Sequence, residues 1–389
     1  MKLGLLAAVY GFVAGAVAAL VLWFMGIATK LVWSGPADAR WYIFAVVMAG
    51  GLLIALLRHR HAGLDLEQQI DASRSPAINM HRSALIMAAM AVIAVAFGGA
   101  IGPEAGILAV VTEMSAIIIF LLGRDNAASR LLSEAGTAGA LGGLYGSPPA
   151  GAVVAQEHPE APRWQIYLAA VSGLLGFLLV ASRLLERGSM RVHLPDYDSA
   201  LDGIEMLQAF APAVLGAAVG LVFAFGLPAI QAALARTGGI VTQTIIGTLL
   251  FAVLATTFPI LLFSGHHELE QLLHWGQQSS MAALLAVGAF KALALSICLA
   301  SGWRGGAAFP LFFAGAAAGG AALWALPQIP VTVTLVAGMS AALTTGLGKP
   351  LPAMLIALFM LGGDAIGAMC VGVAIGWAAS RLAPNHDMH

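Results

Sequence analysis

The chain has 389 residues, of which 60% are hydrophobic and 10% are charged, and its mean hydropathy is +0.90. Soluble domains contain about 45–50% apolar and about 25% charged residues, so this composition indicates a membrane protein with no separate soluble domain. The net charge of −1 excludes a basic surface for nucleic acid. The 46 glycines are typical of membrane helices that pack closely or break within the bilayer.

Redox, metal and hydrolytic chemistry have little support in the sequence. Cys298 and Cys370 both lie in apolar segments, which argues against a disulfide framework and a thiolate metal site. The segment from His266 to His274 contains metal-ligand residue types but lacks a recognisable site spacing, and we interpret it as a wetted loop. We therefore expect no enzymatic activity, no metal and no other cofactor.

Apolar segments that can embed in a membrane recur along the whole chain. The first is longer than a signal peptide and is followed by many more, so we interpret it as a transmembrane helix with a cytoplasmic N-terminus. The arginine-bearing loop from Arg58 to Arg82 agrees with that orientation, because short cytoplasmic loops are rich in Lys and Arg. In chain order the predicted segments are Leu3–Ile27, Trp41–Leu57, Ser83–Phe97, Gly106–Leu122, Gln165–Ser182, Leu207–Leu227, Gly239–Phe263, Ser280–Leu299, Leu311–Trp324, Val331–Leu347 and Ile366–Ala383.

An internal repeat divides the chain near its middle. Residues 135–148 align without a gap with residues 337–350 at a constant offset of 202, and residues 98–102 align with 301–305 at an offset of 203. Paired Gly/Pro-interrupted helices of this kind mark the substrate sites of transporters. We predict two transmembrane halves, 1–190 and 205–389, joined by a loop over 191–204.

A single carboxylate lies in the interrupted element of the first half. Glu104 follows Gly102-Pro103 at the start of an apolar helix, and a charge within the membrane is a functional hypothesis by default. A helix N-terminus has unpaired N–H groups and a partial positive charge, so it stabilises a carboxylate or a small anion in its place. Glu104 could therefore be a competitive gate, or could simply cap its helix.

The corresponding element of the second half carries no charge. Gly305-Gly306-Ala307-Ala308-Phe309-Pro310 begins another apolar helix. Two helix N-termini that converge from opposite sides of the membrane, without Lys or Arg, would bind an anion weakly enough to release it. Weak binding of this kind is what transport requires.

These elements resemble those of the CLC chloride channels and proton-coupled anion exchangers. Residues 102–106 resemble the family's Gly-Arg-Glu-Gly-Pro element, and residues 301–310 are similar to its Gly-Gly-Ile-Phe-Ala-Pro stretch, with Lys291 in register upstream. Residues 131–151 resemble its Gly/Ala-rich helix that ends in Ala-Pro-Leu-Ala-Gly, and residues 264–269 resemble a Ser-Gly-Gly-rich element. Each motif alone is weak, but the ordered set covers most of the chain.

The resemblance implies a fold and a set of roles. The fold would be an all-α integral membrane protein with about ten or more tilted and broken helices in an antiparallel inverted repeat. A short bacterial-type member of the family, without cytoplasmic regulatory domains, would form a homodimer in the inner membrane with one pore in each subunit. Glu104 would be the gate for chloride or a similar anion, and the binding amides would be those of Ala105, Gly306, Ala307, Ala308 and Phe309.

Three departures from the family pattern leave the preferred anion open. The family's first anion-binding loop would fall near residues 62–67, which contain no serine, and no tyrosine follows Tyr197 to serve as its C-terminal pore tyrosine. Pro103 replaces an arginine and has no N–H to donate.

Proton coupling is also open at the sequence level. The register places His158, preceded by Glu157, at the family's second proton-handling position, and a histidine can relay protons near neutral pH. An exchanger would use one of these residues, whereas a channel would need neither. The alternative function is a proton-coupled transporter of another small substrate, with Glu104 as its proton site.

Overall fold

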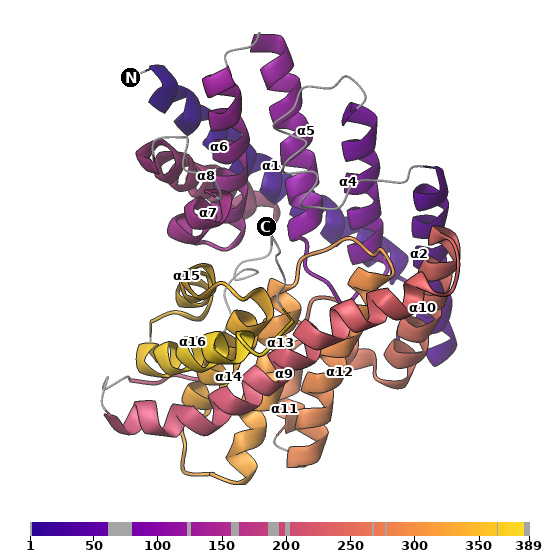
Figure 1. Cartoon of the computed structure of the whole chain (residues 1–389), viewed down its shortest axis with the longest axis vertical. Coiled ribbons are helices and arrows are strands. Elements are labelled where there is room, and N and C mark those ends of the chain that lie inside the picture. The colour runs from indigo at the N-terminus through magenta and orange to yellow at the C-terminus, as the bar shows by residue number, and fades with distance from the viewer. Residues whose placement is uncertain are drawn as a thin grey trace.

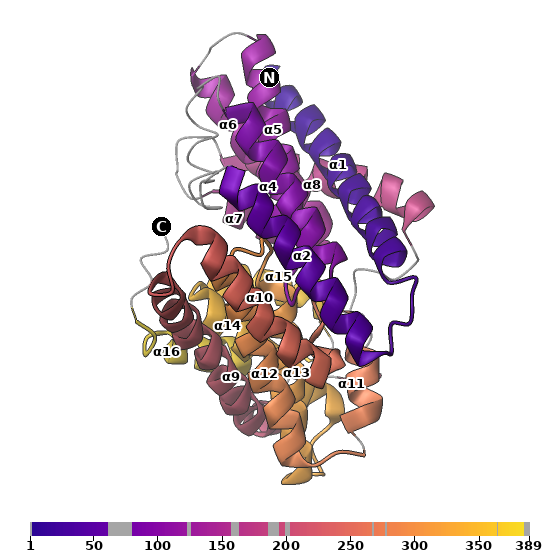
Figure 2. The same ribbon diagram turned by 90° about the vertical axis from the view of Figure 1, so that its right-hand side faces the viewer.

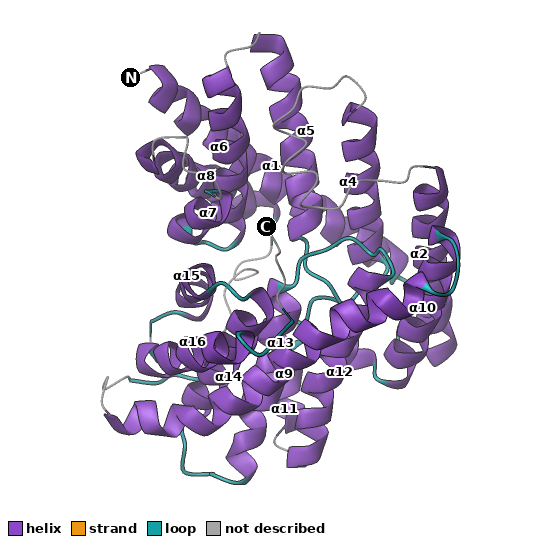
Figure 3. Ribbon diagram, in the orientation of Figure 1, coloured by secondary structure: helices purple, strands orange, loops and turns teal. Residues whose placement is uncertain are grey.

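The computed structural model describes residues 2–60, 80–122, 126–156, 163–185, 194–198, 203–266, 268–276, 278–363 and 365–384. Within these ranges the chain is helical and forms no strand (Figure 3). Six of the described helices are long and apolar enough to cross a membrane. The expectation of an all-α integral membrane protein is confirmed.

The first half of the chain forms a group of helices at the top of Figure 1. Its helices are α1 (Lys2–Val32), α2 (Arg40–Arg60), α4 (Met80–Ala96), α5 (Glu104–Leu122), α6 (Asn126–Leu144), α7 (Pro148–Ala155) and α8 (Arg163–Leu184).

The second half forms the group at the bottom of the same view. Its helices are α9 (Gly203–Ala235), α10 (Ile240–Thr257), α11 (Leu269–Gly276), α12 (Met281–Ala300), α13 (Ala308–Ala321), α14 (Val331–Leu347), α15 (Pro350–Leu361) and α16 (Ile366–Ser380), with 3₁₀ turns η1 (Pro259–Leu261) and η2 (Ala322–Trp324).

The same neighbour relations recur in the two halves. Helix α1 packs against α6 and α8, while α9 packs against α14 and α16 in the same way. The pairs α4 and α5, and α6 and α7, have counterparts in α12 and α13, and in α14 and α15. The Gly/Ala segments that align at the offset of 202 therefore begin in α6 and in α14, which hold corresponding places in the two groups.

Glycines allow the helices of each group to approach closely. A Cβ at Gly173 of α8 would overlap the backbone of Gly139 in α6, and a Cβ at Gly139 would overlap the backbone of Gly11 in α1. In the second half, a Cβ at Gly216 of α9 would overlap Gly338 of α14. Small residues at such contacts let membrane helices pack backbone to backbone, which explains the glycine content.

Helix α2 joins the two groups. It packs against α10 of the second half, and both views show the two helices side by side (Figure 2). A Cβ at Gly51 of α2 would overlap the Thr248 side chain of α10. The contact fixes one group of helices against the other.

Two predicted segments differ most from the observed helices. The single segment expected over Gly239–Phe263 ends as a helix at Thr257 and continues in the 3₁₀ turn η1, because Pro259 has no N–H for a helical hydrogen bond. The segment expected over Leu207–Leu227 is a longer helix, Gly203–Ala235, that contains Pro212 and Pro228. Neighbouring helices make proline tolerable inside a membrane helix.

Candidate functional site

The site lies where the two interrupted elements meet. Gly102, just before α5, and Gly306, just before α13, exchange two backbone hydrogen bonds in an isolated antiparallel bridge. The N–H of Gly102 donates to the Gly306 carbonyl at 2.8 Å, and the N–H of Gly306 donates to the Gly102 carbonyl at 3.0 Å. This bridge brings the first turns of α5 and α13 to one place, although they are about two hundred residues apart in the chain.

Glu104 lies in this bridge region and is 4% exposed. Its carboxylate is packed over the two glycines, since a Cβ added at either Gly102 or Gly306 would overlap it. Its Oε2 is buried and has no hydrogen-bond partner among the described residues. A buried carboxylate oxygen without a donor is costly, so the described residues leave one side of the Glu104 carboxylate unsatisfied.

The first turn of α13 faces the same region. Ala308 and Phe309 are its first two residues, so their N–H groups have no carbonyl acceptor within the helix, and both residues are buried. Ala105 is buried in the first turn of α5. Gly306 differs from the expectation, because its N–H is already bonded to Gly102. The hydrogen bonds that join the two elements therefore already use the Gly306 N–H.

Tyr145 is a site residue that the sequence alone did not reveal. Its hydroxyl lies 3.5 Å from Glu104 Oε1, at the limit of a hydrogen bond, and its ring lies 6.2 Å from that of Phe309. It follows the last residue of α6 and precedes the cap of α7. The sequence feature that could have pointed to Tyr145 is its position inside the repeated Gly/Pro segment, beside Gly146-Ser147-Pro148. A tyrosine hydroxyl is therefore present near the carboxylate, although no C-terminal tyrosine supplies it.

The loop that carries Gly306 is fixed by contacts with α2 and α10. Arg58 of α2 donates to the Ser301 carbonyl at 2.8 Å and to Thr244 Oγ1 at 2.6 Å. Trp303 is fully buried, and its Nε1 donates to Thr248 Oγ1 at 3.0 Å. These bonds cap the end of α12 and hold the backbone that leads to the Glu104 region.

Two predicted features lie outside the described residues. Glu157 and His158, the candidate proton relays, fall between α7 and α8 in a range that the structure does not describe, and so does the predicted anion-binding loop near residues 62–67.

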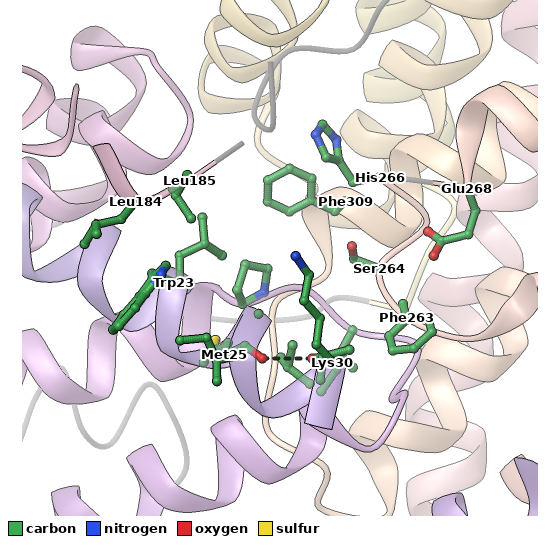
Figure 4. Close-up of a pocket in the computed structure, with 17 residues that line it drawn as sticks. Trp23, Met25, Lys30, Leu184, Leu185, Phe263, Ser264, His266, Glu268 and Phe309 are labelled. Carbon is green, nitrogen blue, oxygen red and sulfur yellow. Dashed lines mark hydrogen bonds between the residues drawn. The ribbon is translucent and has the colours of Figure 1, made fainter. Parts of the chain in front are cut away.

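A cavity of about 380 Å³ opens next to the Glu104 element. Pro103 and Phe309 are among its lining residues, and the ring of His266, which also lines it, lies edge-on to Phe309 at 5.4 Å. Figure 4 shows the side chains around this space.

Comparisons with known proteins agree with the architecture. The family model described as voltage gated chloride channel matches residues 50–381. YfeO of Escherichia coli strain UMN026, named as an ion-transport protein, is 28% identical over 312 residues that cover 77% of this chain and 72% of YfeO.

Two solved structures share the fold over nearly the whole chain. A CLC-type fluoride/proton antiporter has a TM-score of 0.78 at 18% identity, covering 98% of this chain and 96% of that one. A slow cyanobacterial Cl⁻/H⁺ antiporter has a TM-score of 0.74 at 17% identity, covering 98% and 93%. The inverted, broken-helix fold expected from the sequence is confirmed.

Proposed function

The chain belongs to the voltage-gated chloride channel (CLC) family, and from that premise we propose that it moves small inorganic anions across the membrane through a pore gated by Glu104. It is an integral membrane protein of a transport family, and its anion transport is that of a channel or an exchanger. We further propose which residue forms the gate, which backbone amides bind the anion, and which residues would couple transport to protons.

The observation that carries the proposal is the position of the Glu104 carboxylate. It is packed against Gly102 and Gly306, with the first turn of α13 beside it. A helix N-terminus binds a carboxylate and a halide by the same N–H groups and the same partial charge. An ionised Glu104 therefore competes with the transported anion, and a protonated Glu104 leaves the site to the anion.

The remaining assignments follow from that competition. Ala307, Ala308, Phe309 and Ala105 offer backbone amides, while Gly306 contributes the bridge that positions them. Glu157 or His158 would pass protons to the cytoplasm if the protein is an exchanger. The two halves, 1–190 and 205–389, would form one pore in each subunit of a homodimer in a bacterial inner membrane, with a cytoplasmic N-terminus.

The test is simultaneous measurement of anion and proton flux in liposomes. We expect chloride or fluoride flux that depends on pH in the wild-type protein. In Glu104→Gln the side chain keeps its size but cannot ionise, so the pH dependence and any proton coupling should disappear.

A matched variant, Glu113→Gln, changes another buried glutamate of α5 and should keep the pH response. Retained proton coupling in Glu104→Gln would place the gate elsewhere, and the absence of anion flux from folded wild-type protein would disprove the function.

A further inference from the structure

The loop that leads to Glu104 is held by the other half of the chain. In the first half, Arg58 at the end of α2 donates to the Ser301 carbonyl at the end of α12. The repeat offset of 203 makes Gly98 the counterpart of Ser301, and the Gly98 carbonyl accepts the N–H of Phe263 at 3.1 Å. Phe263 follows α10 and η1, and α10 packs on α12 as α2 packs on α4. The two halves therefore hold each other's interrupted elements at equivalent carbonyls.

The turn that presents the Phe263 N–H has a strained backbone. Phe263 has a φ of 57°, the one positive value among the non-glycine residues that the structure describes. A bulky side chain rarely adopts this left-handed region, and such a conformation persists only where surrounding contacts impose it. The contacts around residues 261–263, hereafter the 261–263 turn, must therefore supply the restraint.

Lys291 of α12 supplies that restraint. Its side chain is fully buried, and its ammonium group donates to the carbonyls of Leu261, Leu262 and Phe263 at 3.1, 3.0 and 2.8 Å. The ammonium group also lies 4.9 Å from the centre of the Phe313 ring in α13. Three carbonyls use the three N–H donors of a lysine, and hydrogen bonds from a charged donor are the strong ones. One cation thus fixes three consecutive residues.

Filling space does not explain a charge in this position. Ionisable residues inside membrane helices are rare and costly, and an apolar side chain of similar size avoids the cost of removing a charge from water. Glu268 attracts the Lys291 ammonium group electrostatically, while the three hydrogen bonds all go to backbone carbonyls. The backbone that it holds is therefore the best explanation for this lysine.

The 261–263 turn lies a short distance along the backbone from Glu104. Glu104 is six residues beyond Gly98, whose carbonyl the turn holds. Trp33 adds a second hold on this loop, because its Nε1 donates to the Ala96 carbonyl at 3.0 Å and its ring lies 5.4 Å from that of Phe263. A shift of the turn would therefore be passed to the segment that carries the carboxylate.

We propose that Lys291 is a positioning residue for Glu104. By holding the 261–263 turn, it fixes the Gly98 carbonyl and keeps the Glu104 carboxylate in its buried place, where it competes with the anion. The inference rests on the proposed function. Lys291 acts through backbone hydrogen bonds, as Arg58 does on the loop of the second half.

The first experiment measures this hold directly, by hydrogen exchange and mass spectrometry of the full chain in detergent. Lys291→Met keeps a similar volume but cannot donate, so the amides of residues 98–102 should exchange about tenfold faster, as expected for the loss of charged hydrogen bonds. Lys291→Arg keeps the charge and the donors and should retain most of the protection. Ser296→Ala is the control, because its buried hydroxyl bonds the Ala292 carbonyl within α12, and it should leave this segment unchanged.

A backbone variant tests the same link without altering a side chain. Incorporation of 3-phenyllactic acid in place of Phe263 replaces the N–H with an ester oxygen, which removes the donor to the Gly98 carbonyl. Residues 98–102 should again exchange faster. The same replacement at Phe258, whose N–H donates to the Leu254 carbonyl at the end of α10, should leave them unchanged.

The second experiment measures how the hold affects the gate. The ratio of anion flux at low pH to flux at neutral pH in liposomes reports how firmly ionised Glu104 blocks the site. Lys291→Met should raise flux at neutral pH about threefold and lower this ratio, because a loosened segment lets the ionised carboxylate leave. In a Glu104→Gln background the same change should leave the ratio unaltered. The Tyr145 hydroxyl, the titratable group 3.5 Å from Glu104 Oε1, is present in every variant.

The outcomes separate this inference from the proposed function. Unchanged exchange over residues 98–102 in Lys291→Met and in the Phe263 ester would overturn it. An unaltered flux ratio with an equal loss of flux in both Glu104 backgrounds would also overturn it, because Lys291 would then support folding alone. If Lys291→Met does not fold, the Phe263 ester takes its place in both measurements. Absence of wild-type flux would overturn the proposed function, and hydrogen exchange would still decide whether Lys291 holds this segment.

Discussion

Glu104 is held by residues that come from three separate parts of the chain. Gly102 precedes it, Gly306 reaches it from the second half, and the Tyr145 hydroxyl lies at 3.5 Å from its Oε1. One carboxylate oxygen has a weak donor and the other has none among the described residues. The described residues therefore stabilise this position of the side chain only lightly, as the proposed gating role requires.

The Tyr145 hydroxyl gives a residue-scale prediction. Tyr145→Phe removes the donor and keeps the ring contact with Phe309. A hydrogen bond of this kind contributes about 0.5–1 kcal/mol, so its loss should ease the release of Glu104 and raise anion flux at neutral pH about two- to fivefold. Liposome flux measures the change.

Two controls isolate that effect. Tyr10→Phe removes another buried hydroxyl, which is hydrogen-bonded to Ser115 Oγ at 2.6 Å, and should leave flux unchanged. In a Glu104→Ala background the Tyr145→Phe change should have no further effect, because the pair is already broken. If Tyr145→Phe raised anion flux by the same factor in Glu104→Ala, the Tyr145 hydroxyl would act on the anion path directly and not through Glu104.

At the scale of helices, the interrupted elements were predictable and several boundaries were not. The Gly-Pro-Glu pattern indicates the start of α5 at Glu104, and the Gly-Gly-Ala-Ala-Phe-Pro pattern indicates α13 at Ala308, because glycine and proline change the backbone in known ways.

The other boundaries lack such a signal. Helices such as α9 are apolar on every side in a membrane, so hydropathy does not mark where they end. Helix α6 was recognised as part of the repeat but not as a span, since Ser133 and Glu134 lower its apolar content.

The contact of Tyr145 with Glu104 was also beyond sequence reasoning. The two residues lie 41 positions apart, and their approach depends on how α5 and α6 pack. Local patterns show where helices are interrupted, whereas contacts made by side chains from other helices need tertiary structure.

Arg58 gives a prediction at the scale of helix ends. Its guanidinium bonds the Ser301 carbonyl at the end of α12 and Thr244 of α10. Removing charged hydrogen bonds costs about 1.5–3 kcal/mol, so Arg58→Gln should lower the thermal unfolding midpoint in detergent and reduce flux, because the Ser301–Gly306 loop loosens. Arg60→Gln, at an exposed position in the same helix, is the control. Equal thermal unfolding midpoints for Arg58→Gln and Arg60→Gln would contradict a role of Arg58 in holding the end of α12.

At the scale of the whole molecule, the fold is two copies of one packing arrangement. In each group a long first helix, α1 or α9, lies against a Gly/Ala-rich helix, α6 or α14, and against the last helix, α8 or α16. The contacts are made at glycines in both groups. The duplicated arrangement places the starts of α5 and α13 together, so the stability of each group determines the geometry of the site.

This arrangement predicts matching effects of one added methyl group in either half. A Cβ at Gly173 would overlap the backbone of Gly139, and a Cβ at Gly338 would overlap the backbones of Gly315 and Gly319. Overpacking costs about 1–3 kcal/mol when the neighbour is rigid, so Gly173→Ala and Gly338→Ala should both lower the fraction of monodisperse protein in size-exclusion chromatography and lower the unfolding midpoint. Gly320→Ala of α13, where the nearest atom is a Leu335 methyl carbon at 3.8 Å, should behave as wild type. If only one of the two variants is destabilised, the close helix contacts of the two groups contribute unequally to the stability of the protein.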